Sequence, residues 1–196
     1  MTVAAILLAA GQGTRFGAQP KLLAPLGGKP LVRHAAEAAA ASSARPVIVV
    51  TGHRAEEVSR QLAGLPVTLV HNPDFASGLS GSLKAGFAAL PDGAGAAVVL
   101  LGDMPRISAA LVDALCDAWE RAGAPPALVP VFSGRRGNPV VLSAALRPDI
   151  MALAGDAGAG PILRGRADVV EWVTDDPSVV QDVDTPDALA RLPSAG

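Results

Sequence analysis

Short, continuous apolar runs alternate with segments of helical periodicity through the first two thirds of the chain. The runs lack polar alternation, which is typical of strands buried on both faces of a parallel sheet. The pattern predicts strands at residues 3–8, 47–50, 67–70, 97–101 and 128–131. Helices are predicted between them, at residues 31–42, 55–62 and 80–90, with a fourth running from the N-cap Ser108 to about Arg121.

This order of elements predicts an α/β fold, a three-layer sandwich with a mostly parallel sheet covered on both faces. After residue 131 the pattern loosens into a hairpin loop, a short strand and a glycine-rich loop, at 132–139, 140–142 and 155–160. A short helix, a strand and a closing helix are then expected at 161–164, 169–173 and 186–192. Because no repeat or linker interrupts the pattern, we expect one domain over residues 1–196.

Composition narrows the class of protein. Half of the 196 residues are apolar and the net charge is −2, so we expect a globular protein without affinity for nucleic acid or anionic membranes. No apolar stretch approaches the roughly 20 residues of a membrane span, and the N-terminus lacks a basic leader pattern. The single cysteine, Cys116, excludes an intramolecular disulfide and lies in a helical pattern typical of core positions. A cytoplasmic enzyme is the expectation.

A glycine loop follows the first predicted strand. It contains Gly11, Gly13 and Gly17, carries Arg15 and ends at Lys21. Glycines let backbone N–H groups turn towards an anion, and the two cations add charge, so the loop predicts a polyphosphate site. It is not a Walker loop, which requires Gly-Lys-Ser/Thr, and it lacks the third glycine of a dinucleotide fingerprint. The alternative is an ordinary strand-to-helix turn with solvated charges.

Two aspartates are candidate metal ligands. Asp103 follows the apolar strand at 97–101, and ligands of open α/β sheets bind along that carboxyl edge. Asp184 precedes Thr185-Pro186, with Asp182 as a weaker neighbour on the same face of an extended segment. Mg²⁺ takes few carboxylates plus substrate phosphates, which two distant aspartates and a triphosphate would supply. The alternatives are an incidental aspartate in a turn and, for Thr185, simple helix capping.

A second polar loop lies at the entry of the helix predicted at 80–90. Ser80 and Ser82 stand in a glycine- and serine-rich turn, and Asn72 lies upstream. Free N–H groups at a helix start form a polar site, although ordinary capping explains the same residues.

These motifs resemble those of the MobA-like nucleotidyltransferases, whose fold is a glycosyltransferase-A-like (Rossmann-like) sandwich. The segment from Leu8 to Leu22 is similar to their signature, and its Ala-Ala-Gly form is closest to the CTP-using molybdopterin cytidylyltransferases. The resemblance implies Mg²⁺ bound by Asp103 and Asp184, with catalysis by Lys21, Arg15 and Asp103. It implies nucleotide binding by Ala9, Ala10, Gly11, Gly13, Arg15, Lys21, Asn72, Ser80, Ser82 and Gly102.

The acceptor side departs from the family pattern at two positions. Asn138 stands where these cytidylyltransferases usually show histidine, and Gly160 replaces an arginine in the segment that begins Gly155-Asp156. The resemblance implies acceptor binding by Asn138, Asp156 and Gly158. Charge could come instead from Arg135, Arg136 and Arg164.

The expected function is transfer of CMP from CTP to molybdopterin with release of pyrophosphate, for a target molybdoenzyme. One alternative keeps the reaction and changes the acceptor to a sugar or polyol phosphate. Another is a non-catalytic nucleotide-binding chaperone of a molybdoenzyme, against which Lys21, Asp103 and Asp184 argue. The three histidines do not cluster in sequence, and no chemistry is assigned to them.

Overall fold

The sheet is built around β1 (Thr2–Ala9), which is buried along nearly its whole length. Its side chains alternate between the two faces of the sheet. Ala5 and Leu7 belong to one hydrophobic cluster, and Ile6 and Leu8 belong to the cluster on the opposite face. Burial on both faces explains why this strand reads as a continuous apolar run rather than an alternating one.

The computed structural model describes residues 1–17 and 19–192. The central sheet has the order β10-β7-β9-β6-β1-β4-β5. β1 pairs in parallel with both β4 (Val47–Thr51) and β6 (Ala94–Leu101), and β4 pairs in parallel with β5 (Thr68–His71). Because Leu8 of β1 pairs with Leu101 of β6, the loops that follow these two strands start at the same edge of the sheet.

The other half of the sheet is mixed. β9 (Val140–Ser143) lies antiparallel between β6 and β7 (Ala127–Phe132). β8 (Arg135–Arg136) forms a hairpin with β7, and β10 (Val169–Val173) pairs with β7 in parallel. The predicted mostly parallel sheet is therefore confirmed, and β9 and β8 form its antiparallel part.

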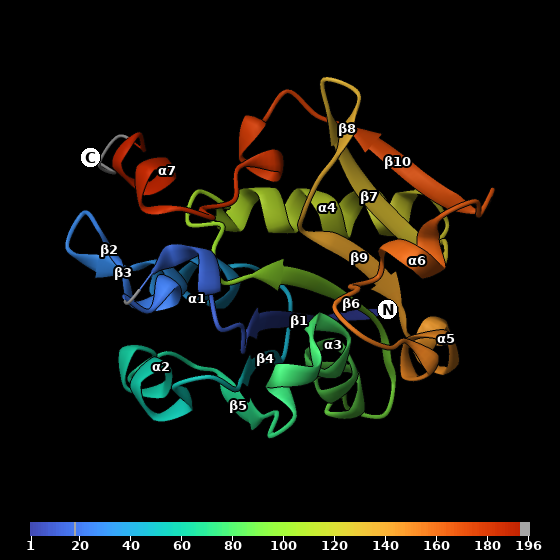
Figure 1. The fold of residues 1–196 in the computed structure, drawn as a ribbon. Helices are drawn as coiled ribbons and strands as arrows, with labels where there is room; N and C mark the ends of the chain where they lie inside the picture. The colour runs from blue at the N-terminus through green and yellow to red at the C-terminus, as the bar shows by residue number, and fades with distance from the viewer. Residues whose placement is uncertain (18, 193–196) are drawn as a thin grey trace.

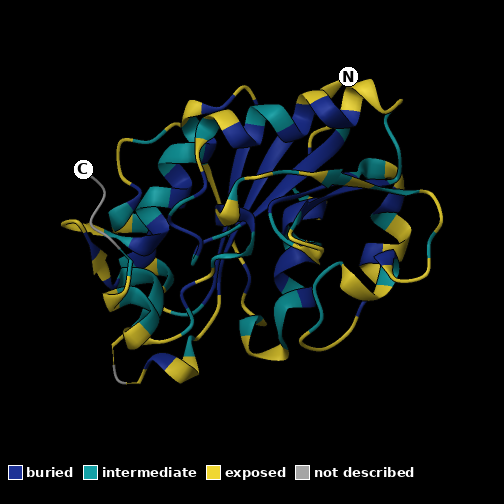
Figure 2. Ribbon diagram, turned by 90° about the horizontal axis from the view of Figure 1, so that it is seen from above, coloured by how far each residue is buried: buried dark blue, intermediate teal, exposed yellow. Residues whose placement is uncertain are grey.

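Helices cover both faces of the sheet, giving three layers (Figure 1). One face packs against α1 (Leu31–Ala41), α2 (Ala55–Gln61) and α4 (Ala109–Arg121). The opposite face packs against α3 (Leu79–Ala88), α5 (Arg147–Ala152) and α6 (Gly160–Leu163). Figure 2 shows buried strands between helices whose outer faces are exposed. No helix in the described ranges is long and apolar enough to cross a bilayer.

A smaller cluster lies beside the main sandwich. Phe16 and Leu26 pack there with Leu31 and Val183. Leu26 belongs to the hairpin of β2 (Pro25–Leu26) and β3 (Lys29–Pro30), and α7 (Pro186–Ala190) contributes Leu189. The cluster thus joins the segment after the glycine loop to the C-terminal segment.

Most predicted elements lie within a few residues of the observed ones. α1 ends at Ala41 instead of residue 42, and β5 begins one residue later than expected. The β2–β3 hairpin, β8 and α5 were not predicted. α5 is a six-residue helix with a proline in its first turn, too short to show a helical period.

Three local expectations are confirmed. Ser108 Oγ accepts a hydrogen bond from the Leu111 amide at 3.1 Å and caps α4, and Thr185 caps α7 in the same way. Cys116 is buried in the core. Burial, with nearby acidic side chains, raises the pKa of the Cys116 thiol to about 12, so it is not a nucleophile at neutral pH.

Candidate functional site

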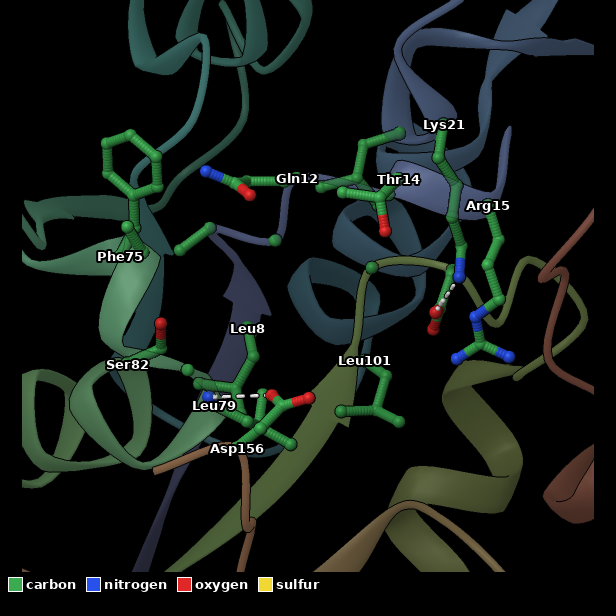
Figure 3. A pocket seen from close by; sticks show the side chains of 18 of the residues that line it. Leu8, Gln12, Thr14, Arg15, Lys21, Phe75, Leu79, Ser82, Leu101 and Asp156 are labelled. Carbon is green, nitrogen blue, oxygen red and sulfur yellow. Dashed lines mark hydrogen bonds and ion pairs between the residues drawn. The ribbon is translucent and has the colours of Figure 1, made fainter. Parts of the chain in front are cut away.

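A cavity of about 500 Å³ opens where the carboxyl ends of β1 and β6 meet. Ligands of open α/β sheets bind at such an edge. The glycine loop after β1, the loop after β6 and the start of α3 form its walls. Figure 3 shows Arg15 and Lys21 on one side of the cavity, and Phe75 and Ser82 on the other.

Four charged side chains form an ion-pair cluster at one end of this cavity. Lys21 Nζ lies 2.6 Å from Asp103 Oδ2 and 2.7 Å from Asp184 Oδ1. Arg15 Nη1 lies 2.8 Å from Asp184 Oδ2. The Lys21 side chain is 11% exposed and that of Arg15 is 76% exposed. Residues separated by more than 160 positions are thus brought together, with a partly buried lysine between two carboxylates.

The ion pairs shift the pKa values of Lys21 and Asp184. Burial alone would lower the pKa of the Lys21 ammonium, but the attraction of Asp103 and Asp184 outweighs it and raises this pKa. The hydrogen bond from Lys21 lowers the pKa of the Asp184 carboxyl, with a further contribution from Arg15. At neutral pH the lysine is therefore charged and Asp184 is ionised.

The backbone of the glycine loop positions Lys21. Gly13 has φ +60°, a conformation that glycine adopts without strain. A Cβ atom at Gly13 would lie 2.6 Å from Lys21 Cβ, so the loop packs directly on the stem of the lysine. Phe16, in the short 3₁₀ turn Thr14–Phe16, is buried in the small cluster and anchors the loop.

Asp184 reaches the site by a route that the sequence did not indicate. Asp184 does not directly follow a strand, because β10 ends at Val173 and the 3₁₀ turn Pro177–Val180 intervenes. The Val183 amide donates a hydrogen bond of 2.9 Å to the Asp103 carbonyl, and the Val183 side chain is buried. This backbone contact places the two carboxylates side by side. Asp182, the weaker candidate, is exposed and does not line the cavity.

The two carboxylates fit a divalent cation. Their oxygens already converge on one positive group, Lys21 Nζ, and Asp103 Oδ1 is buried without a hydrogen-bond partner in the described structure. An unsatisfied carboxylate oxygen favours a cation or a water ligand. The described residues form no group of three or more His, Cys, Asp or Glu side chains able to hold a metal. Mg²⁺, which takes few carboxylates together with substrate oxygens, suits such a pair.

Hydrogen bonds tie the start of α3 to two loops. The Ser80 hydroxyl donates to the Gly155 carbonyl at 2.7 Å, and the Leu79 amide donates to Asp156 Oδ1 at 3.2 Å (Figure 3). The buried Asn72 side chain donates to Ser82 Oγ at 3.2 Å. Of these residues, Leu79, Ser82 and Asp156 line the cavity, whereas Ser80 and Asn72 hold the loops around it.

The remaining sequence candidates divide between two cavities. Ala10, Gly11, Gly13 and Gly102 line the larger cavity, and Ala9 is fully buried behind it. Asn138 and Gly158 line a neighbouring cavity of about 280 Å³. Leu8, Leu79 and Leu101 line both cavities, so the two are contiguous.

Of the three arginines expected to supply charge on the acceptor side, one lines a cavity. Arg136 lines the smaller cavity, and its Nε lies 2.7 Å from Glu171 Oε1. Arg135 and Arg164 line neither of the two cavities.

Sequence reasoning missed part of the larger cavity. Gln12 and Thr14 belong to the glycine loop, and Phe75, Ser77 and Leu79 belong to the segment that connects β5 to α3. The position of this segment, after a parallel strand at the same sheet edge as the glycine loop, was the available signal. The side-chain types gave no signal, because Phe75 and Leu79 have no polar or ionisable group.

Comparison with known proteins assigns the family. The sequence matches the MobA-like NTP transferase domain over residues 5–171, and the chain belongs to this family. It is also 35% identical, over 97% of its length and 96% of the relative, to nicotine blue oxidoreductase of Paenarthrobacter nicotinovorans.

Solved structures agree on the fold. Rv0371c from Mycobacterium tuberculosis H37Rv superposes with a TM-score of 0.82 and 26% identity, covering 97% of each chain. A crystal structure of Rv0371c in complex with manganese is similarly close, with a TM-score of 0.80. A nucleotidyl transferase from Methanothermobacter thermautotroptrophicus gives a TM-score of 0.82 at 26% identity, covering 97% of this chain and 95% of that one.

The family and the fold expected from the sequence are therefore confirmed. The chain has the nucleotidyltransferase fold, an α/β sandwich of the glycosyltransferase-A-like type with a mixed, mostly parallel sheet. These relatives support a MobA-like NTP transferase without singling out molybdopterin or CTP as its substrates.

Proposed function

We propose that this chain transfers CMP from CTP to molybdopterin and releases pyrophosphate. The observation that carries the proposal is the Lys21, Asp103 and Asp184 cluster beside a glycine loop, at one end of a cavity large enough for a nucleotide. A partly buried lysine, two carboxylates and the backbone of a glycine loop are the groups that a triphosphate and its cation require.

Asp103 and Asp184 are the residues that would hold Mg²⁺. When bound, the ion would neutralise phosphate charge and polarise the phosphoryl oxygens. The structure of Rv0371c with manganese supports a divalent metal in this family.

In the proposed reaction a phosphate oxygen of the acceptor attacks the α-phosphorus of CTP. A new oxygen–phosphorus bond forms, the bond from the α-phosphorus to the bridging oxygen breaks, and pyrophosphate leaves with that electron pair. An ionised phosphate monoester is already a nucleophile, so the site requires no general base. Lys21 would neutralise charge on the α-phosphate, and the more exposed Arg15 would bind the β- and γ-phosphates.

Assignment of CTP rests on the Ala9-Ala10-Gly11 segment. Ala10 lines the cavity with only 2% of its surface exposed. Gly52 packs closely against Ala10, since a Cβ atom at Gly52 would lie 2.8 Å from Ala10 Cβ. A tightly packed floor favours the smaller pyrimidine base over a purine.

Three further candidate functions are weighed against this proposal. Another phosphorylated acceptor, such as a sugar or polyol phosphate, would use the same cluster. The identity of 35% with nicotine blue oxidoreductase favours an oxidoreductase as a second candidate function. A non-catalytic chaperone of a molybdoenzyme would bind the nucleotide without turning it over.

A matrix of nucleotides against acceptors tests these candidates. CTP, GTP and ATP are each combined with molybdopterin, a sugar phosphate and a polyol phosphate, and pyrophosphate release is measured with Mg²⁺. The proposal predicts release with CTP and molybdopterin, lost in Lys21→Ala. Release with another acceptor would correct the substrate. Nucleotide binding without release would favour the chaperone. Reduction of nicotine blue by the protein, in a separate assay with an added reductant, would favour the oxidoreductase.

A further inference from the structure

The smaller cavity has an unusually apolar wall for a site next to a phosphate-binding loop. Aliphatic side chains from six elements line it: Leu8 of β1, Leu79 and Leu83 of α3, Leu101 of β6, Val129 of β7, Val140 of β9 and Leu163 of α6. Among its described lining residues, the polar side chains are those of Arg136 and Asn138, and there is no carboxylate, hydroxyl or imidazole. Arg136 is already paired with Glu171.

The cavity lies where the second substrate of the cluster must bind. Leu8, Leu79 and Leu101 line both cavities, so an acceptor in the smaller one would lie next to a nucleotide in the larger one. Its volume of about 280 Å³ is close to the lower end of ordinary small-molecule pockets, which begin at about 300 Å³.

Gly160 adds neither a side chain nor a charge to the wall of this cavity. It lines the cavity, and a Cβ atom built on it meets no other atom within 4 Å. An arginine is expected at this position from the resemblance to the cytidylyltransferases, so this chain lacks a cation there. The space beside Gly160 is therefore available to an uncharged part of a ligand.

We propose that the acceptor is a phosphate monoester whose body is a flat or branched apolar group, such as a ring system with few hydroxyls, and that this body occupies the smaller cavity. The inference rests on the proposed nucleotidyl transfer. A sugar or polyol would bury hydroxyls without partners against these leucines and valines. Each unpaired hydroxyl lowers affinity from about fivefold to more than a hundredfold.

Binding measurements test the proposal without requiring turnover. The probes are 1-naphthyl phosphate and ribose 5-phosphate, titrated by calorimetry into the protein saturated with a non-hydrolysable CTP analogue and Mg²⁺. We expect 1-naphthyl phosphate to bind at least about tenfold more tightly, because burying its rings costs no unpaired hydroxyl. Equal affinities, or tighter binding of ribose 5-phosphate, would overturn the proposal.

Substitutions at Gly160 locate the binding. Gly160→Leu should lower affinity for 1-naphthyl phosphate about tenfold or more by filling the cavity, and Gly160→Ala should give an intermediate loss. The affinity for the CTP analogue should not change. Ala167→Leu, on an exposed residue outside the cavity, is the matched control. Unchanged naphthyl phosphate affinity in both Gly160 variants would contradict the assignment to this cavity.

These outcomes are distinguishable from failure of the proposed function. Selective, Gly160-dependent binding of 1-naphthyl phosphate by a protein that releases no pyrophosphate would refute the transferase and keep the apolar acceptor site. Efficient turnover of a sugar phosphate would keep the transferase and refute the apolar acceptor site.

Discussion

Lys21 lies between two carboxylates whose charges it neutralises. Its side chain is 11% exposed, and both of its contacts are shorter than 2.8 Å. The arrangement keeps the lysine charged and holds Asp103 and Asp184 together, in position to exchange this ammonium group for a divalent cation and phosphate. Each residue of the cluster therefore has a separable expected effect on binding or chemistry.

The carboxylates are tested by Asp103→Asn and Asp184→Asn. Each change keeps the shape of the side chain and removes the charge that would hold Mg²⁺. We expect folded proteins with turnover reduced about 100-fold or more, since one lost electrostatic group costs that much in comparable sites. Asp182→Asn, on an exposed neighbour outside the cavity, should retain full turnover. Near-wild-type turnover in either cavity variant would refute the paired-carboxylate account.

The cations are tested by Lys21→Ala and Arg15→Ala. Removing Lys21 should lower kcat by about 100-fold, because its charge is needed in the transition state. Removing Arg15 should raise the CTP dissociation constant as well, since it is placed to bind the outer phosphates. Lys29→Ala, on an exposed residue paired with Glu37, is the control. If Lys21→Ala altered only thermal stability, the loop would have a structural role.

Base selectivity is tested by Ala10→Gly. Removing the Ala10 methyl should widen the cavity floor and raise kcat/KM for GTP relative to CTP, without abolishing CTP use. The expected change is about 10-fold, the usual size for one methyl group in a shape-selective pocket. Side-by-side kcat/KM values decide it. A wild-type protein that already prefers GTP or ATP would contradict the cytidylyl assignment and leave nucleotidyl transfer intact.

Among the elements, α3 shows how secondary structure and loops together shape the site. Gly78, which precedes α3, has φ +105°, and a Cβ atom there would lie 2.6 Å from the backbone of Gly155 and Asp156. The same loop accepts hydrogen bonds from the Ser80 hydroxyl and from the Leu79 amide. The start of α3 and the loop at residues 155–156 are therefore packed together at one glycine.

Gly78→Ala should disturb this junction beyond the cost of backbone strain. Gly93→Ala is the matched control, because Gly93 has φ +90° but a Cβ atom there meets nothing within 4 Å. Both variants should lose about 1–3 kcal/mol of unfolding free energy from strain. Gly78→Ala should lose more and also bind CTP more weakly. Equal unfolding free energies, measured by urea denaturation, would show that the junction contributes nothing.

Elements with a strong local pattern could be predicted from the sequence. Continuous apolar runs mark β1, β4 and β6, which are buried on both faces. These runs were enough to predict a parallel arrangement and the position of Asp103 at the carboxyl edge of the sheet. α5 is too short for a period, and the antiparallel position of β9 depends on tertiary pairing. The structural roles of Asn72 and Ser80 were equally invisible, because a serine that binds a loop carbonyl has the same sequence signal as one that binds a ligand.

At the scale of the whole molecule, the fold joins distant segments into one site. The site contains the loop after β1, the loop after β6 and a C-terminal segment that returns to Asp103 through Val183. The resemblance to a family supplied the pairing of Asp103 with Asp184, which no local pattern contains. The apolar cavity beside it was not predicted, because its aliphatic wall residues come from six elements and look like ordinary core residues in the sequence.

The central claim is nucleotidyl transfer with attack at the α-phosphorus. Its most direct test follows CTP labelled at the α-phosphate during incubation with molybdopterin, Mg²⁺ and the wild-type protein. The account predicts that the label moves into a covalent CMP–molybdopterin product, with one unlabelled pyrophosphate released per product and no transfer in Lys21→Ala. Label that stays in CTP, or a protein that binds CTP and never releases pyrophosphate with any acceptor, would contradict it.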